Sequence, residues 1–320
     1  MYTGMDTVNR LYEALGVEDE WSVRYENGFK WWPTERAQTV EILGEADGPE
    51  GERGFYISIR TEDSPVEELD SHFLQWTNVL KMPFASMAGP VYNPREGLAE
   101  LCSWALVYEH ISGWMGPLLA MAAALQVFET REVDPSCDKF AGHPENGVRK
   151  KPNSIVNTIP GVVQPAGESP SRWAGQEFDE AAELADSLPL VILATSGGRG
   201  LTAEFPFGNF SSLLQIDGAM QHPVYGRGLL QLQYFPVSGK KGEDEKWIKK
   251  ALELNEPCIS PVPAGYGFGS YLYRDGMITH VSFIPNALYV PGLLNNLLLS
   301  AMGRAEAMNR ELAGERGRVR

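Results

Sequence analysis

The feature of this 320-residue chain that most constrains its fold is an internal repeat with a shift of 174 residues. Arg53-Gly54 precedes a segment of alternating apolar residues, and Arg227-Gly228 does the same 174 positions later. Pro83, which follows a helical pattern, recurs as Pro257 at the same shift. Self-similarity at a fixed period is typical of a duplicated structural unit. We therefore predict two copies of one fold; the alternative is two unrelated α/β domains that share turn residues by chance.

Residue patterns in the first half predict an α-β-β-β-α-β-β-α unit. Asn27-Gly28 is a turn sequence that favours a hairpin between its flanking strands. Ser64-Pro65 indicates the start of a helix, because serine is a good N-cap and proline suits the first helical turn. Apolar residues that recur every two positions indicate strands, and those at intervals of three or four indicate helices. The predicted elements are helix 6–16, strands 21–25, 29–32 (extended by 39–43) and 54–60, a helix from 64, strands 85–92 and 98–108, and helix 114–129.

The second half repeats this order. Three glycines in 196–200 favour a hairpin turn, whereas a phosphate-binding loop needs a following lysine and helix. The tail from Gly303 carries five arginines, of which Arg304 is the first, and its last residues are predicted to be frayed, solvated charge. The predicted elements are helix 176–187, strands 190–195, 201–205 and 229–234, and helices 247–254 and 290–308.

Composition divides the chain into a first repeat at 1–131, a linker at 132–171 rich in proline and glycine, and a second repeat at 172–320. We expect residues 155–163 of the linker to pack against a domain, because long loops without structure are uncommon. The last helix of each repeat is too apolar for a surface helix, which buries one narrow apolar stripe; we expect it to be buried on most sides. We therefore predict an α+β fold with antiparallel sheets, whose two halves pack across a pseudo-twofold axis as in a fused homodimer.

Charge and cysteine content restrict the partners. The net charge of −15 repels a phosphate backbone, so we expect no nucleic-acid partner. The three cysteines are far apart and include no CxxC pair, which supports neither a disulfide framework nor a structural zinc. The start of the chain lacks a secretory pattern, and the apolar stretch 114–128 is shorter than the roughly 20 residues of a membrane span. We expect a cytoplasmic protein without a membrane partner.

Polar residues give no convincing catalytic or metal site. Glu109 and His110 are neighbours in a predicted strand, so their side chains point to opposite faces. Cys137 and His143 lie in the linker, and this pair falls short of the four ligands of a closed zinc site. We therefore predict no catalytic residue, no cofactor and no metal.

Two aromatic clusters are candidate surfaces for a partner. Alternation along a strand sends Trp31 and Trp32 to opposite faces, so one of them is a candidate for exposure. Tyr266 and Phe268 alternate with glycines, a pattern that presents an apolar edge; the alternative is a bulged edge strand that packs internally. The predicted partner-binding residues are Trp31, Trp32, Tyr266, Phe268 and Tyr271.

The element order resembles the type III secretion chaperone-like fold, which includes the YbjN-like proteins. The resemblance covers residues 5–130 and again 173–312, and rests on a strand like 54–60 followed by an amphipathic helix. It implies an acidic, non-enzymatic protein that dimerises and, in the chaperone branch, holds unfolded client segments on hydrophobic patches. Two units in tandem look like a built-in dimer, so we expect a monomer with an internal pseudo-dimer, or a homodimer.

Two hypotheses about function follow. The first is a non-enzymatic chaperone-like or regulatory protein that presents an apolar groove or a sheet edge to a polypeptide. The second is an enzyme or small-ligand binder with a site in the cleft between the repeats, formed by groups such as His280, Tyr273, Asp275 and Arg274. Polar residues with perturbed pKa values in an enclosed pocket would favour the second hypothesis, and an apolar interface between the halves would favour the first.

Overall fold

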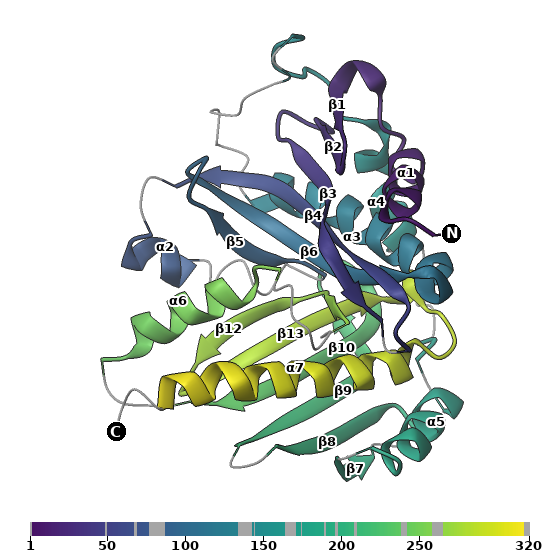
Figure 1. Cartoon of the computed structure of the whole chain (residues 1–320), viewed down its shortest axis with the longest axis vertical. Helices are drawn as coiled ribbons and strands as arrows, with labels where there is room; N and C mark the ends of the chain where they lie inside the picture. Colours follow the sequence, from purple (N-terminus) through teal and green to yellow (C-terminus); the bar gives the residue numbers. More distant parts are fainter. Residues whose placement is uncertain are drawn as a thin grey trace.

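The computed structural model describes residues 2–48, 50–66, 69–76, 87–133, 143, 145–163, 171–173, 175–188, 190–195, 198–207, 210–237, 242–257 and 265–316. Over these residues the chain is an α+β protein with seven helices and two antiparallel sheets, of seven and six strands. Figure 1 shows the sheet of the first half above that of the second half, with the last helix lying across the lower sheet. This arrangement is consistent with two domains.

The first sheet is built mainly from the first half. Its strands are β1 (Ser22–Tyr25), β2 (Gly28–Trp31), β3 (Gln38–Asp47), β4 (Arg53–Pro65), β5 (Gly89–Asn93) and β6 (Leu98–Tyr108). They follow the order β1-β2-β3-β4-β6, and β5 lies on the far edge of β6. The longest ladder joins β4 to β6 and begins with Gly54 opposite Tyr108.

The second sheet has the same strand order when strands are counted along each half. Its strands are β7 (Val191–Thr195), β8 (Gly200–Phe207), β9 (Phe210–His222), β10 (Gly226–Pro236), β12 (Ser270–Arg274) and β13 (Met277–Pro285). The order is β7-β8-β9-β10-β13-β12. In the ladder between β10 and β13, Gly228 lies opposite Pro285, as Gly54 lies opposite Tyr108 in the first sheet.

Helices cover the sheets. They are α1 (Gly4–Ala14), α2 (Ser71–Trp76), α3 (Ser112–Val133), α4 (Ser154–Val163), α5 (Gln176–Ala185), α6 (Asp244–Leu254) and α7 (Leu293–Arg316), with 3-10 turns η1 (Asp19–Trp21), η3 (Glu109–Ile111) and η4 (Asn286–Leu288). α3 packs on β4 and β6, and α7 packs on β8, β9 and β10. A capping box closes the start of α1, where the Asp6 carboxylate accepts hydrogen bonds from the backbone N–H and the hydroxyl of Thr3.

One short strand of the second half belongs to the sheet of the first half. β11 (Tyr266–Gly267) pairs with β6 and continues the edge along which β5 pairs with residues 98–102. The Leu106 N–H also donates to the Gly265 carbonyl at 2.9 Å. A Cβ atom at Gly267 would lie 2.1 Å from Trp104 Nε1, so glycine is required for this close approach. The strand therefore ties the two halves together.

Equivalent elements of the two halves also meet. β5 contacts β12, and α2 contacts α6. Asn255, just after α6, joins them: its Nδ2 donates to the Pro90 carbonyl at 3.0 Å, and its Oδ1 accepts from the Tyr271 N–H at 2.7 Å. One apolar cluster runs through both halves and includes Trp31 and Trp173. The halves are therefore packed together by apolar and polar contacts.

The strand count differs from the sequence prediction. Residues 39–43 lie in β3, a separate strand paired with β2 and β4, because the chain reverses between Trp31 and Gln38. β9 was not predicted, since Ser211, Ser212 and Gly218 interrupt its apolar pattern. Each half thus has four strands, not three, between its first two helices.

Part of the predicted linker is helical. α4 spans most of the 155–163 segment, and its Val156 and Ile159 are buried. Arg149 lies against the first half, where its Nη1 donates to the Trp32 carbonyl at 3.1 Å. Structure in this stretch therefore covers side chains of the first repeat.

One helical stretch, Glu109–Thr130, is long and apolar enough to cross a membrane by length and composition. Within the fold, 61% of its most apolar part is buried. A helix at the centre of a core has the same composition, because it is covered on most sides. The expected cytoplasmic location stays a prediction.

Candidate functional site

A cavity of about 300 Å³ lies where the two halves meet. Its walls are α6, α7 and the strands β11, β12 and β13 of the second half, and Trp104 of β6 closes it from the first half. Figure 1 shows α7 lying across one face of the second sheet and α6 next to β12. Apolar walls come from Trp104, Leu254 and Met308. The cavity is of a size that suits a small organic ligand.

Arg304 is the main charged group of this pocket. It lies on α7 and is only 3% exposed. Its Nε donates to Gln233 Oε1 at 3.1 Å and its Nη1 donates to Ser300 Oγ at 2.9 Å, but its Nη2 has no partner. No carboxylate of the described residues forms an ion pair with it, and burial lowers its pKa. A buried cation without a counterion is costly, because it loses its hydration without an electrostatic replacement.

Two further buried groups of the pocket wall lack partners. His280 on β13 is 1% exposed and Tyr266 on β11 is 5% exposed. His280 Nδ1 and the Tyr266 hydroxyl form no hydrogen bond with any described residue. Burial, with a smaller contribution from the Arg304 charge, holds the pKa of His280 well below its ordinary value, and burial raises the pKa of Tyr266. At neutral pH the buried part of the pocket lining therefore has one cation, Arg304, and two neutral hydrogen-bonding groups, His280 and Tyr266.

The corresponding region of the first half is fully paired. Ser103 lies opposite Ile59 in that sheet, as His280 lies opposite Gln233 in the second. Gln126 of α3 forms hydrogen bonds with Ser103 Oγ and with the Thr61 hydroxyl, each at 2.8 Å. In the second half, the Gln231 amide and the Ser282 hydroxyl also lack partners, two residues further along the same strands. The unpaired polar atoms are thus concentrated under α7, which makes the two halves asymmetric.

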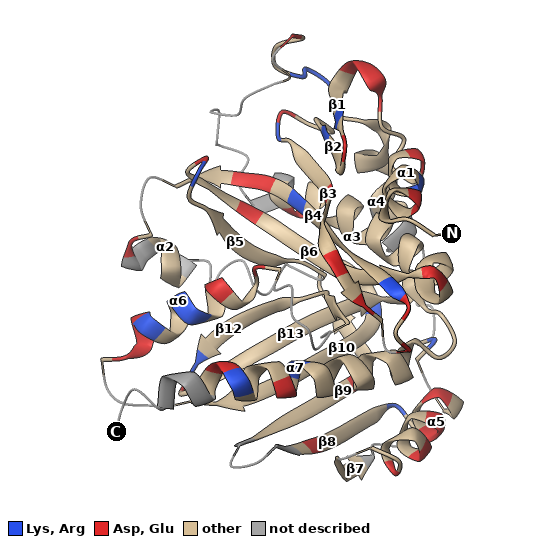
Figure 2. Ribbon diagram, in the orientation of Figure 1, with Lys and Arg blue, Asp and Glu red and all other residues tan. Residues whose placement is uncertain are grey.

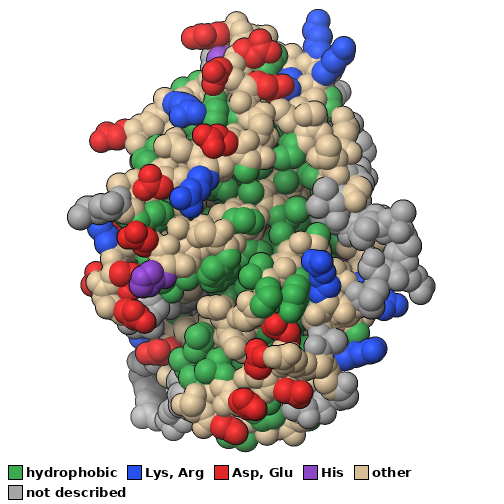
Figure 3. Space-filling model, turned by 90° about the vertical axis from the view of Figure 1, so that its right-hand side faces the viewer, with side chains coloured by type: hydrophobic (Ala, Val, Ile, Leu, Met, Phe, Trp, Pro, Cys, Tyr) green, Lys and Arg blue, Asp and Glu red, His purple; other side chains and the backbone are tan. Residues whose placement is uncertain are grey.

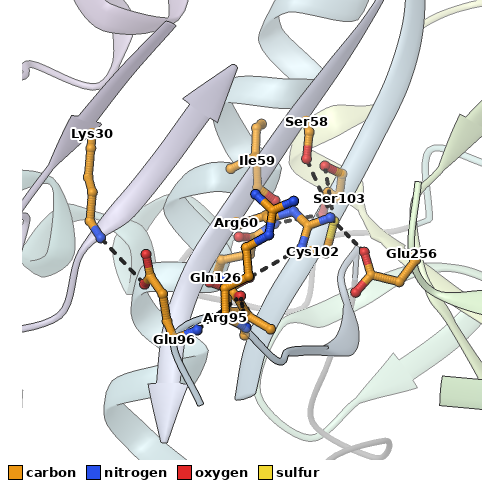
Figure 4. A network of polar contacts seen from close by, with 12 residues as sticks. Lys30, Ser58, Ile59, Arg60, Arg95, Glu96, Cys102, Ser103, Gln126 and Glu256 are labelled. Carbon is orange, nitrogen blue, oxygen red and sulfur yellow. Dashed lines mark hydrogen bonds and ion pairs between the residues drawn. The ribbon is translucent and has the colours of Figure 1, made fainter. Parts of the chain in front are cut away.

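Charged residues surround the mouth of the pocket. Lys250 of α6 binds Glu311 of α7 at 2.9 Å. Glu256 binds Arg60 of β4 at 2.6 Å, an ion pair that joins the two halves (Figure 4). Figure 2 shows acidic and basic residues mixed along α6 and along the coloured part of α7. The mouth is thus polar, whereas the interior holds the one uncompensated charge of Arg304.

Stability should depend on pH through His280. Because its pKa in the folded state is depressed, the unfolded chain binds a proton first as the pH falls below 6.5, so stability is lost in that direction. We expect a loss of about 1.4 kcal/mol per pH unit below 6.5 until the folded pKa is reached. The groups that face His280 are Arg304 of α7, Gln233 of β10 and Tyr271 of β12.

The measurement is urea unfolding between pH 7.5 and 5 for the wild-type protein and His280→Gln. The variant should lose this part of the pH dependence, because it has no titrating group at the site. Parallel curves for the two proteins would contradict the prediction.

The described residues of the adjoining polar network include no activated nucleophile. Cys102 on β6 is buried, and burial raises the pKa of its thiol to about 12. Its nearest polar contact is Ser58 Oγ at 3.8 Å (Figure 4). A thiol with a raised pKa is a poor nucleophile at neutral pH. Among the described residues no group of three His, Cys, Asp or Glu side chains is placed to hold a metal ion.

The predicted partner-binding residues lie inside the protein. Trp31, Trp32, Tyr266 and Phe268 are at most 5% exposed, and Tyr271 is half-buried. Trp32 is covered by the His143 ring, 4.8 Å away between centroids. Tyr266 and Tyr271 line the pocket. Four of the five side chains are therefore too deeply buried in this structure for a partner on the surface to contact them.

Of the residues proposed for a cleft, His280 alone lines the pocket. The Tyr273 hydroxyl donates to Asp244 at 2.9 Å, and Arg274 and Asp275 lie in an exposed turn. His110 lies in η3, away from the pocket lining, and Cys137 lies outside the described residues. Arg304 was not predicted, because it was assigned to the basic tail. Its spacing from Leu297, Ala301 and Met308 places it on the buried stripe of α7, and this spacing could have predicted its burial from the sequence.

A second hollow is apolar and lies on another face. It has a volume of about 630 Å³ and is lined by α1, α3 and α4, with Gly116, Met121 and Ile159 among its residues. Figure 3 looks at the molecule from the right-hand side of Figure 1 and shows apolar side chains gathered across the middle of this face. We call this hollow the α1–α3–α4 groove.

No protein-family model, curated protein or solved structure matches this chain.

Proposed function

We propose that this protein binds a small anionic ligand in the pocket between its two halves, with Arg304 as the residue that holds the anion. The supporting observation is the buried guanidinium, which has an unpaired Nη2 and no carboxylate partner among the described residues. An anion bound there would supply the missing counterion and hydrogen-bond acceptor. This proposal is the small-ligand hypothesis stated above, but its main residue is Arg304, which was not among the residues suggested there.

We further infer that the two halves arose by duplication and pack as a pseudo-twofold dimer. The common strand order and the contacts between equivalent elements, β5 with β12 and α2 with α6, support this inference. In a symmetric dimer, equivalent residues keep equivalent roles. After duplication each copy changes independently, so one half can keep a closed polar core while the other acquires a binding site. The paired Gln126 and the unpaired Arg304 fit such a division.

Replacement of Arg304 by methionine tests the proposed function. We expect the ligand-free variant to be more stable than the wild type by about 1 kcal/mol or more, because the cost of the unpaired buried charge exceeds the two hydrogen bonds lost. Anions should stabilise the wild type against thermal unfolding but not the variant. The measurements are urea unfolding and melting temperature with formate, acetate, benzoate, phosphate and sulfate.

The matched control is Arg274→Met, which removes an exposed arginine that does not line the pocket. It should change stability little and keep the response to anions. The proposal fails if Arg304→Met is strongly destabilised and no anion in the panel stabilises the wild type, since Arg304 would then be a structural residue.

The α1–α3–α4 groove supports a second proposal, in which the protein also binds an apolar segment of a polypeptide. The resemblance to chaperone-like proteins favours this activity, and so does the exposed edge strand β7, where Val191 and Leu193 are about half exposed. Cross-linking in cells tests it. A polypeptide captured by the wild type should be lost with Met121→Lys in the groove and kept with Leu299→Lys on the exposed side of α7. Equal capture by both variants would exclude the groove.

A further inference from the structure

We propose that the ligand of the pocket is a monocarboxylate with an aromatic or branched apolar body. The inference rests on the proposed function and names the chemical class of its ligand. It follows from three features of the described residues: the groups at the inner end of the pocket, the apolar wall, and the carboxylates at the mouth.

The inner end suits a single carboxylate. Arg304 Nη2 and the Tyr266 hydroxyl are donors without acceptors, and His280 Nδ1 adds a third polar atom that can donate. A guanidinium and a carboxylate are both planar, and the pair forms strong charge-assisted hydrogen bonds. One buried positive charge neutralises one negative charge. A phosphate dianion would leave a net charge in the interior, because Arg304 is the one fully buried cation of the pocket lining.

The wall next to these groups suits an apolar body. Trp104 of the first half faces Leu254 and Met308 of the second half across the cavity. Aromatic and aliphatic groups bury favourably against such side chains, and sulfur contacts aromatic rings well. Since Trp104 also borders Gly267 of β11, a ligand that fills this space would touch both halves. Binding should therefore strengthen the connection between them.

The mouth disfavours a second negative charge. Glu253, Glu256 and Glu311 lie there, and each keeps more than a third of its side chain exposed. The basic residues of this lining outside the interior, Lys250 and Arg310, are fewer than these three acids, and Lys250 and Arg60 are already engaged in ion pairs. A ligand that ended in a second carboxylate or phosphate would place that group among these acids. The far end of the ligand should therefore be neutral or cationic.

Calorimetric titration with matched compounds tests the ligand class. Benzoate should bind to the wild type and benzamide should not, because benzamide keeps the ring but lacks the charge. Acetate should bind about tenfold or more weakly than benzoate, since it lacks the ring. Terephthalate and inorganic phosphate should not bind. Trp104→Leu should weaken benzoate while leaving acetate unchanged, whereas Arg304→Met should abolish both.

The outcomes separate this inference from the proposed function. If phosphate or acetate binds in an Arg304-dependent way as tightly as benzoate, the pocket is an anion site and the monocarboxylate inference is overturned. If no compound binds in an Arg304-dependent way, both are overturned. Binding of benzamide equal to that of benzoate would show an apolar cavity in which Arg304 has no role in recognition.

Discussion

Replacing Trp31 by alanine is expected to lower the free energy of unfolding by about 3–5 kcal/mol. The side chain has no exposed surface and packs in the main apolar cluster. Its Nε1 donates to Gln38 Oε1 at 3.1 Å, and Gln38 in turn donates to Thr61 and to the Ala123 carbonyl of α3. The substitution therefore opens a cavity and also leaves a buried amide oxygen without its donor.

Urea unfolding followed by tryptophan fluorescence and circular dichroism measures this loss. Val23→Ala, in the strand paired with β2, is the control, because Val23 is 43% exposed and should contribute little. The experiment also separates a core role from partner binding. If Trp31→Ala kept the stability of the wild type, its predicted role in binding a partner would become the better explanation.

Local patterns predicted most of the elements near their true positions. Arg53-Gly54 and Arg227-Gly228 do lie at the start of strands that occupy the same place in each sheet. The reason is physical, since alternation with one buried face is a property of a few consecutive residues. β9 was not predicted, because Gly218 interrupts its apolar pattern. The reason for this glycine is a contact with a residue far away in the sequence, since a Cβ atom at position 218 would lie 2.5 Å from the Trp173 carbonyl oxygen.

Exposure could not be predicted in the same way. Trp31 packs in the main apolar cluster, Trp32 packs against the ring of His143, and Arg149 donates to the Trp32 carbonyl. His143 and Arg149 are both more than 100 residues from Trp32 in the sequence. Tyr266 and Phe268 are buried because β11 joins the sheet of the other half. Such contacts are set by tertiary packing, on which a local sequence window carries no information.

Replacing Asp63 by Asn is expected to destabilise the protein by about 3–5 kcal/mol, because it removes one charge of a buried ion pair and leaves the charge of Arg36 in the interior. Asp63 on β4 is 2% exposed and lies 3.4 Å from Arg36, which is 3% exposed. Arg36 also donates to the Thr130 carbonyl at the end of α3, so the pair joins the sheet to its helix. The measurement is urea unfolding of Asp63→Asn. Glu45→Gln is the control, since the ion pair of Glu45 with Arg53 is exposed and surface pairs contribute little.

The double variant Arg36→Met/Asp63→Leu should recover most of the stability lost in Asp63→Asn, because no buried charge remains. Recovery would show that the penalty comes from the buried charge of Arg36, which Asp63 no longer balances, and not from loss of the carboxylate itself. Equal losses in the single and double variants would contradict this. Asp63→Asn takes away a carboxylate that a buried guanidinium has in the wild type, whereas Arg304 has no carboxylate partner among the described residues of the wild type. Asp63→Asn is expected to lower the free energy of unfolding, and Arg304→Met is expected to raise it. These opposite changes would distinguish a buried arginine that stabilises the fold from one that binds a ligand.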